Sequence, residues 1–360
     1  MKKSDKSVKI QFFVLILFLF AMQVAAGRGV SENSDIVSNE NPAVKYNRIV
    51  QAGPSAFLVE DALYLFPEAK ERVVAMADGN QGSGFFIGDI DPNIKNKKVI
   101  SRRAGTEEIL SLKPDIVVMK NFLKSKMGEP LEKLGVPVMY FNLEDPGSWL
   151  SDVDRLGELF GNPERADEIK NLINIRMNSV TDKIEKIPES KYPEVLFIYW
   201  SVKNGTTAVK VPPLSWMQPE IIRLAGGDPV WKNADTGGYW LKVNIEQIAA
   251  WNPDYIFVAA YNTPVDGVVN TILSDPSWSQ LKAVKNSRLY AFPGDYHSWD
   301  QPDIRWLLGL QWVSSMLYPE LFEGLDMEKE AENFYREMFF IDKEQFDSLI
   351  KPKLHSLDQG

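Results

Sequence analysis

The sequence has no cysteine and only two histidines among its 360 residues. The lack of cysteine excludes disulfide bonds, thiolate metal sites and a cysteine nucleophile. It also excludes a bacterial lipoprotein, because the lipid is attached to a cysteine directly after the signal peptide. Zinc prefers nitrogen and sulfur donors, and one of the two histidines, His355, lies close to the C-terminus. The sequence therefore predicts no site for a bare zinc ion and no cofactor of the protein's own.

Sequence motifs of catalysis and nucleic-acid binding are missing as well. There is no Gly-x-Ser-x-Gly elbow, no phosphate-binding Walker loop and no Gly-x-Gly-x-x-Gly after a strand. The formal net charge is −9 and no basic run is present, so nucleic-acid binding is not expected. After the N-terminal region no apolar run is long enough for a membrane-spanning helix. We expect a protein that is not an enzyme, with an extracytoplasmic enzyme as the alternative.

The N-terminal region has the three parts of a secretory signal peptide. A lysine-rich start is followed by an apolar stretch from Phe12 to Met22 and by small residues at Val24 and Ala26. Residues 1–26 are therefore expected to be cleaved, and an uncleaved membrane anchor is the alternative. Their removal takes away four lysines and one aspartate, which changes the net charge from −9 to −12. Residues 27–45 are rich in serine, asparagine and glutamate, so we expect them to be disordered. Because a signal peptide is present and a cysteine for lipid attachment is absent, we expect the mature protein to be free in the periplasm.

One sequence unit occurs twice. Glu107-Glu-Ile-Leu-Ser-Leu-Lys-Pro-Asp115 is followed by Ile-Val-Val, and Glu246-Gln-Ile-Ala-Ala-Trp-Asn-Pro-Asp254 is followed by Tyr-Ile-Phe-Val. Each copy predicts a short helix, a turn and a buried strand, because proline disfavours helix in the residue before it and a short β-branched run is typical of buried strands. Two copies of one unit indicate two similar lobes.

The order of elements predicts an α/β fold of two Rossmann-like lobes with central parallel sheets. We assign residues 46–145 to the first lobe, 146–190 to a linking helical segment, 191–350 to the second lobe and 351–360 to a tail. From about residue 163 to 186, apolar residues recur with the spacing of one helical face, as in Ile169, Ile173, Met177 and Val180. At 1.5 Å per residue such a helix reaches roughly 36 Å, which is long enough to join two lobes.

Several segments together resemble one family. They are the two glutamates in their repeated units, Leu224-Ala-Gly-Gly-Asp228, Ser298-Trp-Asp-Gln-Pro-Asp303, and Leu317-Tyr-Pro-Glu320 after Leu307-Leu-Gly-Leu-Gln-Trp312. Over residues 46–325 their order resembles the iron-siderophore and cobalamin group of solute-binding proteins of ABC transporters. The resemblance implies two lobes joined by one long helix, a ligand in the cleft between them, and a monomer. It also implies that Glu107 and Glu246 dock onto the transmembrane permease dimer, which works with its ATPase.

Ligand contacts in α/β lobes lie at the carboxyl ends of strands and at nearby helix N-termini. Trp and Tyr provide large rigid contact surfaces, and arginine pairs with anionic groups, although each aromatic residue could equally be a core residue. The shortage of histidine also separates the chain from relatives that bind bare zinc or manganese. The predicted ligand-binding residues are Ser55, Arg102, Arg103, Lys120, Trp200, Trp216, Tyr239, Trp240, Tyr261, His297 and Trp299.

The expected cargo is a small-molecule metal chelate. A ferric siderophore or similar iron chelate comes first, corrinoids or haem come second, and a molybdate or tungstate oxyanion comes third. The aromatic residues favour a bulky, flat and partly apolar ligand, whereas the oxyanion follows only from the resemblance. The sequence thus predicts a periplasmic protein that captures a ligand and delivers it to an ABC importer.

Overall fold

The computed structural model describes residues 45–79 and 84–357. The expected signal peptide, and the expected disordered segment apart from residue 45, lie outside the described residues. The described part of residues 42–360 forms one compact unit. No helix in these ranges is long and apolar enough to cross a membrane.

The first lobe contains a five-stranded sheet in which every strand pair is parallel. The strand order is β3 (Lys98–Ile100), β2 (Val73–Ala77), β1 (Ile49–Gln51), β4 (Ile116–Lys120) and β5 (Val138–Phe141). All five residues of β4 are buried, as expected for a strand covered on both faces. The helices of this lobe are α1 (Ala56–Tyr64), α2 (Ala69–Arg72), α3 (Phe86–Ile90), α4 (Thr106–Ser111) and α5 (Glu129–Glu132).

The second lobe contains a mixed sheet, which differs from the expected parallel one. Its order is β11 (Leu289–Ala291), β10 (Tyr255–Ala259), β6 (Glu194–Lys203), β7 (Thr206–Val211) and β9 (Leu241–Val243), and β8 (Asp228–Pro229) also pairs with β6. The pairs β6–β7 and β7–β9 are antiparallel. The cause is local, because Asn204 and Gly205 both have positive φ angles, of 51° and 76°, and form the two-residue turn that closes a β-hairpin.

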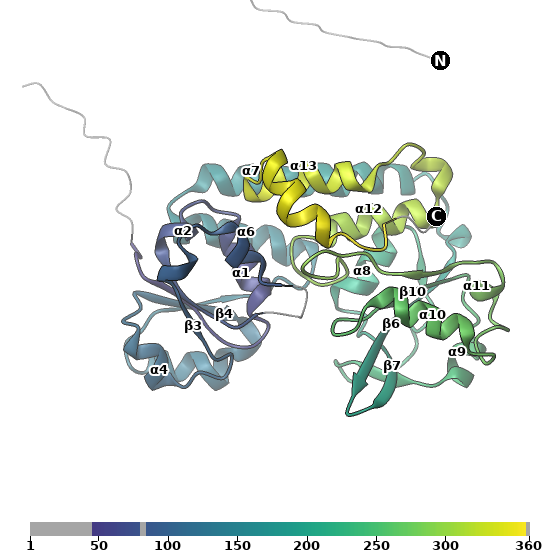
Figure 1. Ribbon diagram of the computed structural model, residues 1–360, viewed down its shortest axis with the longest axis horizontal. Coiled ribbons are helices and arrows are strands. Elements are labelled where there is room, and N and C mark those ends of the chain that lie inside the picture. Colours follow the sequence, from purple (N-terminus) through teal and green to yellow (C-terminus); the bar gives the residue numbers. More distant parts are fainter. Residues whose placement is uncertain (1–44, 80–83, 358–360) are drawn as a thin grey trace, which may run out of the picture. The chain divides into compact units, whose positions relative to one another are not determined.

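The helices around the second sheet complete the lobe. They are α8 (Met217–Leu224), α9 (Ile245–Trp251), α10 (Val265–Ser274), α11 (Lys282–Lys285), α12 (Trp306–Leu317), α13 (Met327–Phe339) and α14 (Lys343–Gln345). Helices α12 and α13 lie over the sheet on the side of the linker helix (Figure 1). Residues 351–357, which the sequence presents as a tail, are packed, since the backbones of His355 and Gly294 exchange two hydrogen bonds.

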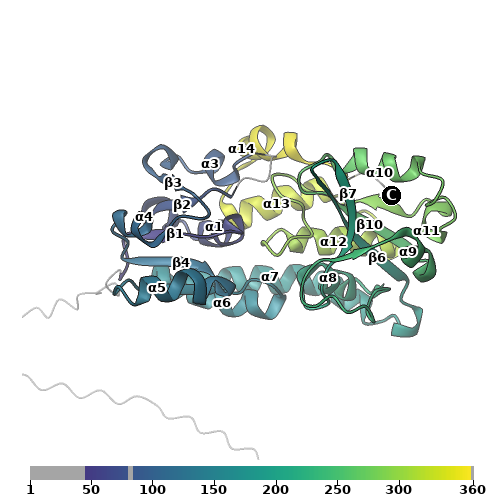
Figure 2. The same ribbon diagram turned by 90° about the horizontal axis from the view of Figure 1, so that it is seen from below.

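A helical linker joins the two lobes, as the sequence predicted. Helix α6 (Pro146–Phe160) begins with a capping box between Asp145 and Ser148 and ends at Gly161, whose φ is +66°. Helix α7 (Pro163–Ile184) follows directly, with the side chain of Asn162 as its N-cap. It passes along both lobes, with α12 and α13 beside it (Figure 2).

The repeated sequence unit has the same local structure in both lobes. Asp115 lies just before β4, and its carboxylate accepts hydrogen bonds from the backbone N–H groups of Asn47 and Arg48 just before β1. Asp254 lies just before β10 and accepts the N–H of Glu194, the first residue of β6. In each lobe the aspartate thus fixes the start of one strand against its parallel neighbour. This role accounts for the aspartate in both copies of the Pro-Asp sequence.

Further contacts between the lobes come from the C-terminal part of the chain. The buried guanidinium of Arg305 lies 2.5 Å from Asp61 of α1 and 3.0 Å from Asp295. Its Nε donates to the hydroxyl of Tyr335 in α13 at 2.7 Å, and Asp303 completes the group. We call these five residues the interlobe charge cluster. Burial raises the pKa of Asp61 to about 6 and that of Asp303 to about 7. Arg305 counteracts this shift only in part, because three buried carboxylates share its one guanidinium.

Candidate ligand cleft

A cleft of about 670 Å³ lies between the two lobes. The first lobe supplies the start of α1 and the segment after β4, and the second lobe supplies the start of α8, the loop before β9 and the segment after β10. This arrangement follows the rule that ligand sites of α/β lobes lie at the carboxyl ends of strands. We call it the interlobe cleft, and its lining residues are Ser55, Phe57, Leu58, Asn121, Phe122, Glu144, Trp216, Gln218, Gly238, Tyr239, Trp240, Tyr261, Gln301 and Pro302.

The second lobe presents a cluster of aromatic rings to this cleft. The rings of Trp216 and Trp240 meet edge to face with centroids 5.4 Å apart. Tyr199 lies 5.0 Å from Trp240 and is stacked on Tyr261 at 4.5 Å. We call these four residues the aromatic wall, of which Trp216, Trp240 and Tyr261 line the cleft. Tyr239, next to it, is 77% exposed, so its ring is available to a ligand without breaking core contacts.

A buried carboxylate lies behind the aromatic wall. Asp300 is fully buried and accepts hydrogen bonds from the Tyr261 hydroxyl at 2.7 Å and from the Gln218 side-chain amide at 3.1 Å. Ser298 donates a third hydrogen bond at 2.5 Å. Burial raises the pKa of Asp300 to about 6, although all three hydrogen bonds favour its ionised form.

The opposite wall carries one further acid. Glu144 lines the cleft, and its Oε1 lies 2.6 Å from Nζ of Lys120. Lys120 is itself 1% exposed and also donates to the backbone oxygen of Asn142. Burial lowers the pKa of Lys120, whereas the adjacent Glu144 raises it in part. The charge of this lysine is therefore engaged by Glu144 behind the cleft surface.

The structure brings five of the predicted ligand residues to the cleft lining and places the other six elsewhere. Those in the lining are Ser55, Trp216, Tyr239, Trp240 and Tyr261. Trp200 lies on β6 directly after Tyr199, and side chains alternate along a strand, so it belongs to the opposite face of the sheet. Arg102 and Arg103 are exposed after β3, where Arg102 lies 3.6 Å from Asp78.

Trp299 and His297 lie in the interior. The Trp299 indole donates to Asp295 at 2.9 Å, and its ring is fully buried. His297 is stacked on Phe57 of the first lobe, with ring centroids 4.4 Å apart. Burial, with Arg305 nearby, lowers the pKa of His297 well below its usual value, so the imidazole is neutral.

Several lining residues were not predicted from the sequence. Phe57 and Gln218 each occupy the first turn of a helix that starts at the cleft, and Phe122 follows the end of β4. The strand-end rule could have identified Phe122. Nothing in the sequence indicated that Asp300 would lie beneath Tyr261 and Gln218, because this contact joins segments that are far apart in the chain.

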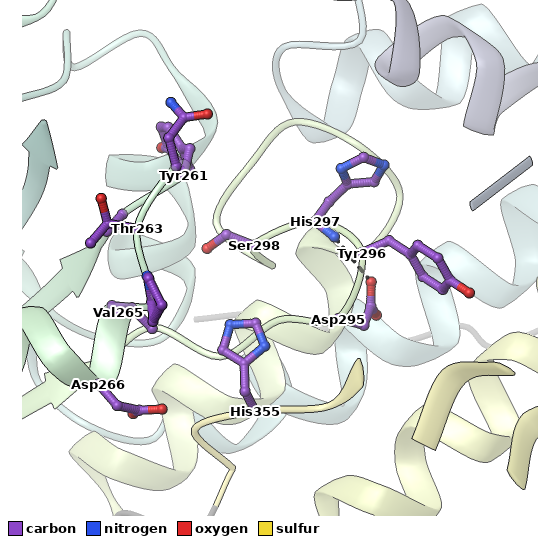
Figure 3. A pocket seen from close by; sticks show the side chains of 12 residues that line it. Tyr261, Thr263, Val265, Asp266, Asp295, Tyr296, His297, Ser298 and His355 are labelled. Atoms are coloured by element: carbon purple, nitrogen blue, oxygen red, sulfur yellow. Dashed lines mark hydrogen bonds between the residues drawn. The ribbon is translucent and has the colours of Figure 1, made fainter. Parts of the chain in front are cut away.

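A second, smaller pocket of about 400 Å³ adjoins Tyr261. Its lining includes both histidines, but the ring of His297 points away from that of His355 (Figure 3). Within the described ranges, no group of three or more histidine and acidic side chains is arranged to hold a metal ion.

The two glutamates of the repeated unit occupy equivalent positions. Glu107 is the second residue of α4, Glu246 is the second residue of α9, and both are exposed. Helices α4 and α9 both lie on the side of the sheets away from α7 (Figure 1). One carboxylate from each lobe is therefore presented on the same side of the compact unit.

Comparison with known proteins places the chain in one protein family. The sequence model of a family described as periplasmic binding protein matches residues 93–296. The molybdate-binding protein MolA of Haemophilus influenzae is 24% identical over 253 residues, which cover 65% of this chain and 69% of that protein. The vitamin B12-binding protein of Yersinia pestis is 24% identical over 229 residues, covering 59% of this chain and 78% of that protein. A solved periplasmic solute-binding protein from Veillonella parvula has a TM-score of 0.67 at 21% identity and covers 85% of this chain and 92% of its own.

Proposed function

The chain belongs to the periplasmic binding protein family, and from this premise we propose that it captures a bulky metal chelate and delivers it to an ABC importer. The chelate is a ferric siderophore or a corrinoid-like molecule. The observation that carries this proposal is the interlobe cleft, with its volume of about 670 Å³ and its aromatic lining. Sites of this size accommodate ligands of tens of atoms, and aromatic rings offer flat apolar contact surfaces.

The charges around the interlobe cleft favour a ligand that is neutral or positively charged. The described lining of the cleft contains no lysine, arginine or histidine, and Glu144 is its one acidic residue. Catecholate chelates and haem carry negative charge that such a lining would not compensate. Neutral and positively charged chelates, such as ferric hydroxamates and corrinoids, meet no such penalty.

An oxyanion such as molybdate is the second candidate, and one observation favours it. Helices α1 and α8 both begin at the cleft, and neither has a side-chain hydrogen bond at its N-cap. Free backbone N–H groups at helix N-termini bind anions. A relative is named for molybdate binding. The cleft volume is much larger than a tetrahedral oxyanion requires, which makes this the weaker candidate.

We propose that Glu107 and Glu246 are the contacts to the permease dimer. Both are exposed, both lie in the first turn of a helix, and each belongs to a different lobe. Two separated carboxylates would match a dimeric partner with one basic pocket in each subunit. The bound ligand would then lie above the centre of the permease, where transport begins.

Titration calorimetry with a ligand panel tests the proposed cargo. The panel contains ferric hydroxamate and catecholate chelates, cobalamin, haem, molybdate and zinc chloride. We expect tight binding of a hydroxamate chelate or a corrinoid and weak or no binding of zinc. Tight binding of molybdate alone would replace the chelate with the oxyanion. Turnover of any panel member would contradict the binding role.

A further inference from the structure

The buried carboxylate of Asp300 has no positively charged partner in the described part of the chain. It is 0% exposed, and no lysine, arginine or histidine among the described residues lies within ion-pair distance. The side chains that donate to it within the described ranges, those of Tyr261, Gln218 and Ser298, are all neutral. Buried carboxylates are ordinarily paired, because burying an uncompensated charge is costly. This carboxylate is directly behind a wall of the interlobe cleft.

Asp300 fixes the polarity of two cleft residues. Because a carboxylate only accepts hydrogen bonds, the Tyr261 hydroxyl and the Gln218 amide group must donate to it. The Tyr261 oxygen can then offer only lone pairs to other groups. Oε1 of Gln218 is left without a partner in the described structure. Asp300 also offsets the positive end of α8, since Gln218 is in the first turn of that helix.

The opposite wall adds no net charge of either sign, because its one acid is paired with a lysine. Glu144 lines the cleft, while its partner Lys120 lies behind it and is 1% exposed. The uncompensated carboxylate of Asp300, buried behind an aromatic wall, therefore gives the cleft a negative potential. Such a potential attracts cations and repels anions.

We propose that Asp300 is a positioning residue that makes the interlobe cleft select positively charged metal chelates over negatively charged ones. This inference rests on the proposed capture of a chelate and assigns its charge class. Asp300 acts through its own charge and by fixing the orientation of the Tyr261 hydroxyl and the Gln218 amide, both of which belong to lining residues of the cleft.

The selection should depend on pH, because the pKa of Asp300 is raised to about 6 by burial. Tyr199 and Tyr261, which interact with Asp300, have raised pKa values and stay neutral near pH 6. His297 has a lowered pKa and is neutral as well. Asp61 and Asp303 of the interlobe charge cluster titrate in the same range, so a control variant there is required.

The experiment uses three ferric trihydroxamates that share one backbone and differ only at a terminal amine. The amine is free in the cationic member, acetylated in the neutral member and succinylated in the anionic member. We expect the cationic member to bind about tenfold more tightly than the anionic one. For Asp300→Asn this preference should disappear, whereas Asp300→Glu, which keeps the charge, should retain part of it.

The pH profile separates a charge effect from a structural one. Affinity for the cationic member should fall as the pH drops through about 6, because Asp300 then becomes neutral. Asp300→Asn should lack this slope, and Asp61→Asn should keep it. If all three members bind equally tightly, or if Asp300→Asn weakens them equally at every pH, the inference is wrong although the proposed function stands. If no member binds, the chelate class fails and this inference fails with it.

Discussion

At the scale of single residues, Trp240 makes more ring contacts in the interlobe cleft than its neighbours. Its ring meets those of Phe197, Tyr199, Trp216 and Tyr261. We expect Trp240→Ala to weaken chelate binding by about 1–2 kcal/mol, because a large rigid contact surface is lost. Calorimetry measures the change. Trp200→Ala is the matched control, since this half-buried tryptophan is on the other face of the same sheet. An equal loss of affinity in both variants would contradict this assignment of the cleft face.

The interlobe charge cluster determines a pH dependence of stability. Asp61 and Asp303 have folded-state pKa values of about 6 and about 7, against an ordinary value of 3.8. The folded protein therefore binds protons more tightly than the unfolded chain, so this stabilisation is complete in acid and is lost as the pH rises through these values. We expect the free energy of unfolding to fall by on the order of 4 kcal/mol between about pH 5 and pH 8.

Urea unfolding followed by circular dichroism at several pH values measures this slope. Asp303→Asn should flatten it, because one of the two titrating carboxyl groups of the interlobe charge cluster is removed. Asp154→Asn, an exposed residue of α6, should leave it unchanged. A stability that rises steadily from pH 5 to pH 8 in the unmodified protein would contradict the assignment.

At the scale of elements, the repeated helix–turn–strand unit supports the docking proposal. We expect the double variant Glu107→Lys and Glu246→Lys to bind ligand normally and to lose transport, because charge reversal turns attraction to a basic pocket into repulsion. Uptake of labelled ligand in cells that depend on this protein measures the effect, with calorimetry on the pure variant beside it. Glu108→Lys is the control, since Glu108 is the next exposed residue of α4. Normal uptake by the double variant would show that these are ordinary surface residues.

Elements with a strong local signal could be predicted from the sequence. The repeated Pro-Asp unit indicated the two lobes, and the apolar spacing indicated α7, which ends at Ile184. The hairpin of β6 and β7 was missed although its Asn204-Gly205 turn is a strong signal. It was missed because the order of helices and strands led us to expect parallel pairing throughout the sheet.

The candidate site could be predicted only where strand ends define it. The strand-end rule selected Tyr261, which lines the cleft, but it also selected Trp200, whose direction depends on the register of β6. Trp299 was selected by its position after a strand, yet a buried partner, Asp295, holds it in the interior. Contacts such as Asp300 with Gln218 depend on tertiary packing, which no local pattern contains.

At the scale of the whole molecule, the lobes are connected by more than α7. The side chain of Arg165 in α7 donates to the backbone oxygen of Leu65 at the end of α1. It also donates to the backbone oxygens of Glu337 and Met338 at the end of α13. The interlobe charge cluster adds a second buried connection through Arg305 and Asp61. A continuous helix and two buried polar connections leave little freedom for hinge motion, because hinges usually occur in loops or at the ends of elements.

We therefore expect ligand binding to change the separation of the lobes only slightly. Small-angle scattering profiles with and without a bound chelate should nearly coincide, and a large fall in the radius of gyration would contradict the linked architecture.

Arg165→Ala should release one of these connections. The substitution removes three hydrogen bonds and leaves the backbone oxygens of Leu65, Glu337 and Met338 without this donor. Hydrogen exchange at the C-terminal end of α13 should then accelerate. Arg155→Ala, whose contacts to Asp152 and to the backbone of Tyr140 stay within the first lobe and α6, should leave that exchange unchanged. Equal acceleration in both variants would mean that Arg165 contributes only general stability and does not hold the lobes together.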